Sequence, residues 1–345
     1  MSLIRLPGLI DAHVHLREPG ATQKEDFYTG SRAALRGGFT YIFDMPNTPV
    51  PTFSPEALQE KISLSQKAVC DIGFHYGTKG DNVASFKTIW NNPKIFGLKL
   101  YCNHTTGDYL IDNPELLGLV FVSWDSPKPI LVHAEGEKLA LVIELARRFK
   151  RNLHVCHISL PEEIDLVRRA KKQGQKISAG VTSHHLFLTR NEGKKQNPFQ
   201  VMKPPLVSKP EQALLWQALY DGTINLIESD HAPHTKTEKE SNNPPFGVPG
   251  LETTLPLLLN LVHTKKMTID QIKNWLYDEP KQIFKIPDQP DTYIEVDPEI
   301  EQIIGESGYE SKCGWSPFDG WKVQGKVVNV VFKGKQVVYN GKLIN

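Results

Sequence analysis

Eight short apolar runs, which alternate with segments of helical periodicity, constrain the fold of this chain most strongly. Apolar strands that alternate with helices predict a parallel sheet whose faces are both covered. Eight such units predict an α/β fold of the (β/α)8 barrel type, which typically needs about 250 residues and fits within the 345 residues present. The expected strands are 9–16, 40–45, 71–76, 96–101, 130–134, 153–158, 177–181 and 224–229.

Several helices are marked by their first residues. Ser54-Pro55 and the Pro-Glu-Glu segment at 161–163 favour helix starts, because proline and acidic residues suit a first turn. The patterns after the eighth strand predict further helices, one strand, and a hairpin that turns at Asn340-Gly341 and pairs with the N-terminal residues. The expected elements are helices 55–69, 137–149, 161–173, 250–263 and 269–276, strand 292–296 and hairpin 326–338.

The domain organisation follows from this order of elements. We expect a barrel over residues 8–285 and a small β subdomain formed by residues 286–345 together with 1–7. Residues 190–210 are polar and rich in proline, and we expect them to form an ordered loop over the barrel mouth.

Composition excludes several classes of partner. The 40 basic and 39 acidic side chains give a net charge of +1, so no large charged field favours nucleic acid or a membrane surface. No apolar run approaches the ~20 residues of a membrane helix, and no signal peptide precedes the first strand. The four cysteines, Cys70, Cys102, Cys156 and Cys313, are widely spaced. They are typical of reduced thiols in a cytoplasmic protein.

The first strand carries a candidate metal site. A (β/α)8 barrel places its active site at the C-terminal ends of the strands. His13, His15 and Arg17 alternate along the first strand, so we expect them to share one face. Two imidazoles can hold one zinc-like ion, and a guanidinium can hold a carboxylate through two hydrogen bonds. A buried, hydrogen-bonded histidine pair is the structural alternative.

Three other predicted strands carry residues that could take part in a metal site. Lys99 lies inside an apolar strand, where a charged amine is expensive to bury. It either reaches solvent or pairs with a carboxylate, or it is neutralised by carbamylation, which offers two oxygens that can bridge two metal ions. His133 and His157 each end a strand. Cys156 and His157 are neighbours, and neighbouring residues of a strand point to opposite faces, so both can face inward only if the strand ends there. His157 is the expected ligand.

The eighth strand ends in Ser-Asp-His-Ala-Pro-His at 229–234. Asp230 could bind a metal ion and also accept a proton, as a general base does. His234 could reach a substrate from the following loop. A turn with local hydrogen bonds is the structural alternative. The combination indicates an active site more strongly than any single residue does, because four histidines, one lysine and one aspartate all fall at predicted strand ends.

These motifs resemble those of the amidohydrolase superfamily and, within it, the dihydroorotases. The chain looks most like the dihydroorotase domain of the multifunctional animal pyrimidine-synthesis protein. The resemblance implies a TIM barrel of the amidohydrolase type and reversible cyclisation of N-carbamoyl-L-aspartate to dihydroorotate. The matching segments are 6–20, 44–48, 97–101, 132–135, 229–234, 250–256 and 315–318.

The resemblance also implies roles for individual residues. Two zinc ions would be held, one by His13, His15 and Asp230 and one by His133 and His157. Carboxylated Lys99 would bridge them, and Asp230 would shuttle the proton. The implied substrate contacts are Arg17, Asn47, Thr105, Lys203, His234 and the backbone near Pro249 and Gly250.

Three positions depart from the animal pattern. Gly180 stands where the animal domain has a glutamate that, together with the Cys156 position, is associated with an additional zinc, so we expect no third zinc. Lys203 replaces an arginine, which keeps the charge but loses the two-pronged geometry. Thr106 replaces an aromatic residue in the loop 103–109, which could weaken loop closure over the substrate.

Two alternative functions compete with this interpretation. A dihydropyrimidinase or hydantoinase would act on a neutral ring, which does not need Arg17 and Asn47. An inactive dihydroorotase-like scaffold that associates with a transcarbamoylase would be expected to lose metal ligands, and all six are present. Relatives often form homodimers, which by analogy is the expected assembly.

Overall fold

The computed structural model confirms the eight-stranded barrel. It describes residues 3–104, 107–190 and 197–344. The barrel strands follow one another in sequence order and are all parallel. A β-bridge between Val14, at the end of the first barrel strand, and His231, just after the last one, brings the two edges together. The strands are β2 (Leu9–Val14), β3 (Phe39–Asp44), β4 (Asp71–Gly77), β5 (Ile95–Tyr101), β6 (Ile130–His133), β7 (Leu153–Val155), β8 (Ile177–Thr182) and β9 (Leu226–Glu228).

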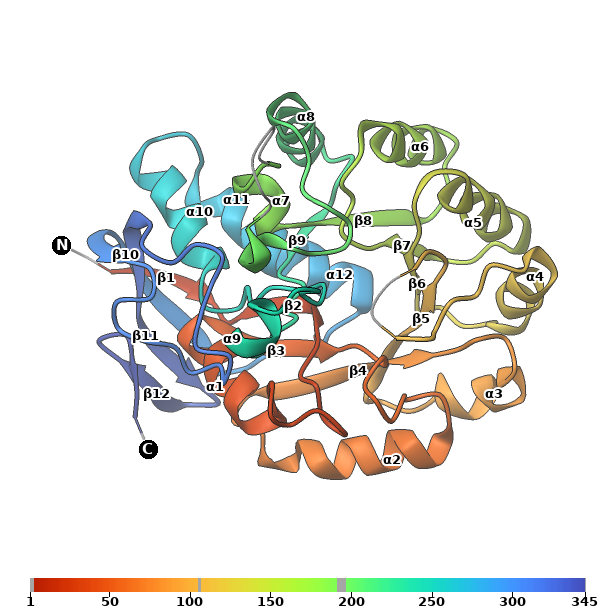
Figure 1. Ribbon diagram of the computed structural model, residues 1–345, viewed down its shortest axis with the longest axis horizontal. Helices are drawn as coiled ribbons and strands as arrows, with labels where there is room; N and C mark the ends of the chain where they lie inside the picture. The colour runs from red at the N-terminus through yellow and green to blue at the C-terminus, as the bar shows by residue number, and fades with distance from the viewer. Residues whose placement is uncertain (1–2, 105–106, 191–196, 345) are drawn as a thin grey trace.

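Helices surround this barrel, and α2 to α6 and α8 form much of the outer ring in Figure 1. The α-helices are α1 (Phe27–Arg36), α2 (Pro55–Leu64), α3 (Phe86–Ile89), α4 (Pro114–Ser123), α5 (Gly136–Phe149), α6 (Pro161–Lys172), α7 (Ser183–Phe187), α8 (Lys209–Tyr220), α9 (Lys236–Lys239), α10 (Thr254–His263), α11 (Ile269–Lys273) and α12 (Glu279–Phe284). The shorter turns are 3-10 helices η1 (Ser65–Lys67), η2 (Val83–Ser85) and η3 (Pro198–Gln200) and the π-helix η4 (Asn274–Asp278). No helix within the described residues is long and apolar enough to cross a membrane.

The predicted start signals act as expected. The Ser54 side chain accepts a hydrogen bond from the Ala57 amide and caps α2. At α6, the Glu163 carboxylate accepts hydrogen bonds from the Ser159 and Leu160 amides. These bonds satisfy amides that the first turn of a helix leaves without a partner.

Several barrel strands end earlier than the apolar runs suggested. β2 ends at Val14, so the predicted strand 9–16 is too long and His15 and Arg17 lie beyond it. His13 and His15 nevertheless point to the same side, because both approach the Asp230 carboxylate. Arg17, His157 and Asp230 have φ angles of 63°, 37° and 45°. Such left-handed backbone costs about 1–3 kcal/mol for a residue other than glycine. In each case the residue lies two or three positions after a strand end, where the chain turns at the barrel mouth.

Aromatic side chains fill the opposite end of the barrel. Phe43 packs against Phe96 with ring centroids 4.6 Å apart and against Phe284 of α12 at 5.7 Å. Ile10 and Leu226, near the starts of β2 and β9, belong to the same buried cluster. The barrel is therefore packed with apolar residues at its N-terminal end, and buried polar groups collect at the other.

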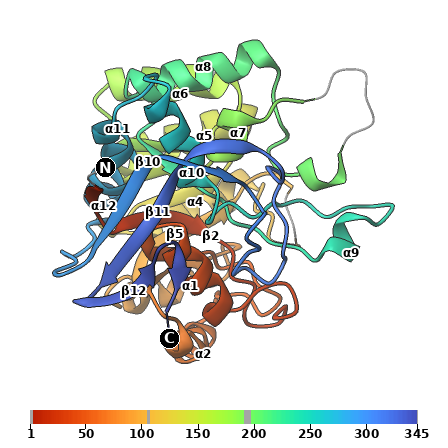
Figure 2. The ribbon, with the colours of Figure 1, turned by 90° about the vertical axis from the view of Figure 1, so that its left-hand side faces the viewer.

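A second, antiparallel sheet contains both ends of the chain, as the N and C marks in Figure 1 show. Its strands, in spatial order, are β1 (Ile4–Pro7), β10 (Tyr293–Ile303), β11 (Lys322–Phe332), β12 (Lys335–Tyr339) and β13 (Lys342–Leu343). Figure 2 shows β10, β11 and β12 side by side. The subdomain boundary at residue 286 remains a prediction, because the sheet alone does not define a domain.

Two details of the expected hairpin are wrong. The N-terminal strand β1 pairs with β10 and not with the hairpin, and Ile4 lies opposite Val296. The hairpin turns at Lys333-Gly334, whereas Asn340-Gly341 leads from β12 into β13. Both dipeptides have positive φ at both residues, as two-residue hairpin turns of type I′ require. The chain thus contains two usable turns where one was expected.

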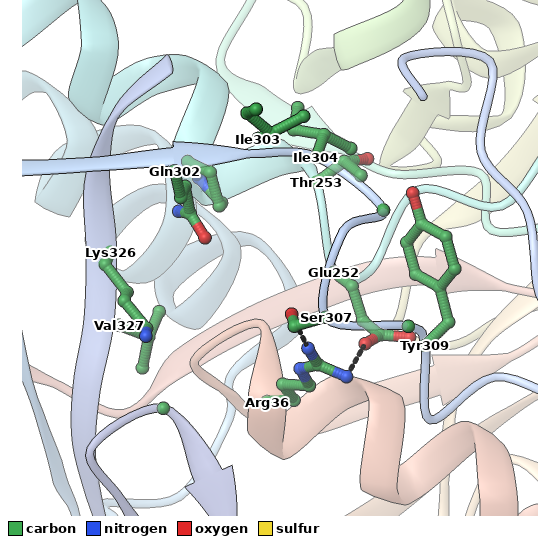
Figure 3. Close-up of a pocket in the computed structure, with 14 residues that line it drawn as sticks. Arg36, Glu252, Thr253, Gln302, Ile303, Ile304, Ser307, Tyr309, Lys326 and Val327 are labelled. Carbon is green, nitrogen blue, oxygen red and sulfur yellow. Dashed lines mark hydrogen bonds and ion pairs between the residues drawn. The ribbon is translucent and has the colours of Figure 1, made fainter. Parts of the chain in front are cut away.

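A cavity of about 540 Å³ lies where this sheet meets the barrel (Figure 3). Arg36 of α1 reaches Glu252 at 3.4 Å and donates a hydrogen bond to Ser307. The Glu252 carboxylate also accepts from the Glu310 and Ser311 amides, at 3.0 and 3.1 Å. Burial raises the pKa of Glu252 to about 7. These charged groups are paired with one another.

Candidate active site

The end of β2 and the turn after β9 bring two histidines and one aspartate together. Asp230 Oδ1 lies 3.0 Å from His15 Nε2 and 3.4 Å from His13 Nε2. Together their ligand atoms form a group within 4.8 Å that could hold a metal ion. His13 and Asp230 are buried and His15 is nearly so. The structure therefore brings together the three residues predicted for one metal ion.

Polar contacts on the far side of each ring, a hydrogen bond at His15 and a nearby carboxylate at His13, orient these histidines. His15 Nδ1 lies 2.8 Å from Asn47 Oδ1, which accepts its proton. His13 Nδ1 lies 3.3 Å from the Glu228 carboxylate. These partners assign the protons to Nδ1 and leave both Nε2 lone pairs facing the Asp230 carboxylate. Acceptors that face each other in a buried place are stabilised by a positive charge between them, which a proton or a metal ion can supply.

A second histidine pair lies beside this group. His133 Nδ1, at the end of β6, is 3.1 Å from His157 Nε2, which follows β7. The rings of His13 and His157 lie 5.2 Å apart, so the two groups adjoin. Burial holds the pKa of His133 and of His157 well below the ordinary value, which keeps both rings neutral at pH 7. Neutral imidazoles are the form that binds metal ions.

Lys99 on β5 lies next to both histidine groups. It is fully buried, and its Nζ lies 3.0 Å from Cys156 Sγ and 5.2 Å from the Tyr101 ring. It does not reach solvent, and within the described residues it has no carboxylate partner. A charged amine in such surroundings is costly, which fits a chemically neutralised lysine.

Cys156 and His157 both face the site, because β7 ends at Val155 and strand alternation no longer separates them. Burial raises the pKa of Cys156 to about 12, so its thiol is protonated at neutral pH.

The donor set fits a divalent metal ion. It consists of imidazole nitrogens and a carboxylate, which suit zinc and similar borderline cations. Zinc binds nitrogen at about 2.0–2.1 Å, so nitrogens 3.1 Å apart, as in the pair His133 and His157, can share one ion. In addition, His133 Nε2 and His157 Nδ1 are buried without a hydrogen-bond partner among the described residues.

A cavity of about 310 Å³ opens beside the first histidine group. Arg17 lines it and is held from behind, since its Nε donates to the Pro233 carbonyl at 3.0 Å. Lys203 lines it as well, with Nζ 5.3 Å from the Phe246 ring. The complete lining is His15, Arg17, Asn47, Lys203, Asp230, Ala232, Phe246 and Gly247. Two cations and one amide thus face the same space as the candidate catalytic carboxylate.

The remaining predicted substrate contacts lie elsewhere. His234 does not line this cavity, and its Nε2 lies 2.9 Å from the Phe246 carbonyl and 3.1 Å from Arg17. The Gly250 amide donates to His231 Nδ1 at 3.2 Å, and neither Gly250 nor Pro249 lines the cavity. The substrate roles of these three residues remain predictions. Thr105 and Thr106 lie outside the described residues.

Sequence reasoning missed Glu228. This residue ends β9 and is fully buried, and its carboxylate faces His13, His154 and the backbone of His157. An acidic residue inside the apolar run 224–228 was the available signal, because a buried carboxylate needs partners.

The chain is similar to several known proteins. The model of the Amidohydrolase family matches residues 4–272. The chain therefore belongs to the amidohydrolase family, whose dihydroorotases depend on metal ions. Within that family it groups with the dihydroorotases: the dihydroorotase of Lactobacillus acidophilus is 34% identical, over 97% of this chain and 88% of that protein. The predicted resemblance is confirmed.

Two multifunctional proteins are also similar. Multifunctional protein pyr1-3 of Dictyostelium discoideum and multifunctional protein CAD of Squalus acanthias are each 42% identical over 99% of this chain. The chain spans only 15% of the length of each.

Solved structures show the same fold. The L-hydantoinase of Arthrobacter aurescens superposes with a TM-score of 0.93 at 23% identity, over 99% of this chain and 87% of that one. The inactive dihydroorotase-like domain of a Chaetomium thermophilum CAD-like protein has a TM-score of 0.84 at 24% identity, over 100% and 97% of the two chains. At these identities the likeness concerns the fold alone.

Proposed function

We propose that this protein is a dihydroorotase, which interconverts N-carbamoyl-L-aspartate and (S)-dihydroorotate in pyrimidine biosynthesis. The observation that carries the proposal is the placement of Arg17 and Lys203 in one cavity with Asp230. Ring closure consumes the side-chain carboxylate and leaves the α-carboxylate in place. A site for this reaction therefore needs cationic groups beside its catalytic carboxylate. The neutral ring of a hydantoin or dihydropyrimidine does not.

Two zinc ions fit the donor set. His13, His15 and Asp230 would hold one ion, His133 and His157 the other, and a carboxylated Lys99 would bridge them. Bound there, zinc supplies Lewis acidity, which polarises the amide carbonyl and lowers the pKa of a water molecule.

Asp230 moves the proton. In hydrolysis it takes a proton from the attacking water and passes it to the departing ring nitrogen. In cyclisation it takes a proton from the ureido nitrogen, which attacks the side-chain carboxylate, and delivers it to the departing oxygen, which takes a second proton from solvent and leaves as water. Burial raises the pKa of Asp230 above its ordinary value. A raised pKa brings the carboxylate closer to the operating pH, where a general base works best.

Arg17, Asn47 and Lys203 bind and orient the substrate. The Arg17 guanidinium is anchored through Nε to Pro233, so its position does not depend on the ligand. Such anchoring lowers the entropy lost when a carboxylate binds. Lys203 offers a second cation, without the paired geometry of an arginine.

The cellular setting belongs to the same proposal. We expect a cytoplasmic enzyme that forms a homodimer and associates with aspartate transcarbamoylase. The two multifunctional relatives support the association, because their sequences extend far beyond the matching segment.

Metal content and turnover, measured on one purified sample, test the proposed function. We expect two zinc ions per chain and hydrolysis of dihydroorotate. Bound metal with hydrolysis of dihydrouracil or hydantoin, but not of dihydroorotate, would identify a different cyclic amidohydrolase. The absence of both bound metal and turnover would identify an inactive scaffold.

A further inference from the structure

The space beside Gly180 is occupied by a carboxylate from the next strand. A Cβ atom at Gly180 would lie 2.6 Å from Glu228 Oε1 and 2.7 Å from its Cδ. Gly180 is on β8 and Glu228 is on β9, which pair in parallel with Thr182 opposite Glu228. The absence of a side chain at position 180 therefore makes room for the Glu228 carboxylate inside the barrel.

Each oxygen of this carboxylate faces a different part of the histidine cluster. Glu228 Oε1 accepts a hydrogen bond from the His157 amide, and Oε2 lies 3.3 Å from His13 Nδ1. His154 Nε2 is 3.6 Å from the same Oε2, and its Nδ1 lies 2.9 Å from Ser178 Oγ. Glu228 therefore contacts one candidate ligand of each histidine group.

These contacts define what Glu228 can do. A carboxylate oxygen 3.3 Å from His13 Nδ1 favours a proton on that nitrogen, which leaves the Nε2 lone pair on the side of Asp230. His157 has a φ of 37°, and the hydrogen bond to its amide stabilises this unfavourable turn. That turn places His157 Nε2 opposite His133.

We propose that Glu228 is a positioning residue of the metal centre, which fixes the tautomer of His13 and the backbone turn at His157. The inference rests on the proposed function, since it concerns the metal ions that this function requires. Carboxylates that orient a metal-bound histidine typically change metal affinity by about 10–100-fold when they are removed.

A different use of the same carboxylate is a direct metal bond. His13, Cys156 and Glu228 also form a group whose ligand atoms lie within 4.8 Å of one another. In the structure, however, Oε1 is engaged by an amide, and the Cys156 sulfur accepts a hydrogen bond from Lys99. Only Oε2 is left to face His13 Nδ1, and we assign it to the orientation of that ring; the number of ions per chain separates this role from a third metal ion.

The test uses four variants of the chain and one control variant. Glu228→Gln keeps the shape and removes the charge, and Glu228→Ala removes the group. Gly180→Glu adds a second carboxylate to the occupied space. The double variant Gly180→Glu/Glu228→Ala delivers one carboxylate from the other strand. Glu163→Gln is the matched control, because Glu163 is equally buried and accepts two amide hydrogen bonds at the start of α6.

We expect Glu228→Gln to keep two zinc ions per chain but to release them to a chelator about 10–100-fold faster. Its kcat should fall while KM changes less than about threefold, and the visible spectrum of the cobalt-substituted enzyme should shift. Gly180→Glu alone should lower the melting temperature, because two carboxylates then share one buried space. The double variant should regain slow release, and Glu163→Gln should match wild type in release and spectrum.

Three results would overturn the proposal. The first is a Glu228→Gln variant that releases zinc at the wild-type rate and has the wild-type cobalt spectrum. The second is a fall from three ions to two in that variant, which would make Glu228 a ligand of a third ion. The third is a well-folded double variant that releases metal as fast as Glu228→Ala. A wild-type chain without metal would instead defeat the proposed function itself.

Discussion

The barrel mouth and the cavity beneath the small sheet both contain buried charges, but they use them differently. In the cavity of Figure 3, Arg36 contacts Glu252 and Ser307, and Glu252 also accepts two amides. At the mouth, buried ring nitrogens such as His133 Nε2 and His157 Nδ1 have no hydrogen-bond partner among the described residues. Buried polar atoms without hydrogen-bond partners therefore mark the candidate site.

Backbone strain separates the two regions as well. At the mouth, left-handed residues such as His157 and Asp230 are buried and lie beside candidate ligands. In the small sheet, Lys333 and Asn340 have similar φ angles but lie in hairpin turns, where such angles are normal. At the barrel mouth, the left-handed backbone directs side chains into the candidate site. In the small sheet, it only reverses the direction of the chain.

The largest expected effect comes from the mouth. Asp230→Asn removes the group that accepts and donates the proton, so kcat should fall by about 10²–10⁴-fold. Steady-state hydrolysis of dihydroorotate, with zinc counted on the same sample, measures it. An unchanged rate in a zinc-loaded variant would show that Asp230 does not carry the proton.

Arg17→Met should have the next largest effect. Loss of a charge-assisted hydrogen bond costs about 1.5–3 kcal/mol, so kcat/KM for dihydroorotate should fall by about 10–150-fold. Dihydrouracil, which lacks the carboxylate, serves as the control substrate. Equal losses on both substrates would mean that Arg17 supports the structure of the site rather than carboxylate binding.

Glu252→Gln tests the cavity beneath the small sheet, where Glu252 pairs with Arg36. This variant should change stability but not turnover. The pKa of Glu252 is raised from 4.5 to about 7, so between these values the folded chain binds more protons than the unfolded chain. The free energy of unfolding of wild type, relative to the variant, should therefore decrease as pH rises through this window, by on the order of 1–3 kcal/mol. Urea unfolding at several pH values measures it, and a pH-independent difference would contradict the assignment.

Lys203→Arg should give the smallest effect. The arginine can form two parallel hydrogen bonds to a carboxylate where lysine forms one, so KM for dihydroorotate should fall about two- to fivefold. Lys203→Met is the companion variant and should raise KM. A higher KM in Lys203→Arg would indicate that the cavity has no room for the larger group.

Much of the fold was predictable because its signals are local. Strand and helix periodicities lie within a few residues, and every predicted barrel strand corresponds to an observed one. The candidate ligands were predictable for a related reason. His133 ends its strand, and barrel strands in parallel all bring their C-terminal ends to one mouth. Turn choice was less predictable, because Lys333-Gly334 and Asn340-Gly341 can both form two-residue turns.

Local patterns in the chain predict the eight-unit barrel, the family, and the imidazole and carboxylate groups at the strand ends. The directions in which those groups point depend on how the strands pack together. Arg17, Cys156 and His157 lie past their strands, where alternation no longer predicts direction. Glu228 fills the space at Gly180 because neighbouring strands pack within side-chain reach. Residues 48 positions apart share that space, and no local pattern in the chain records such a contact.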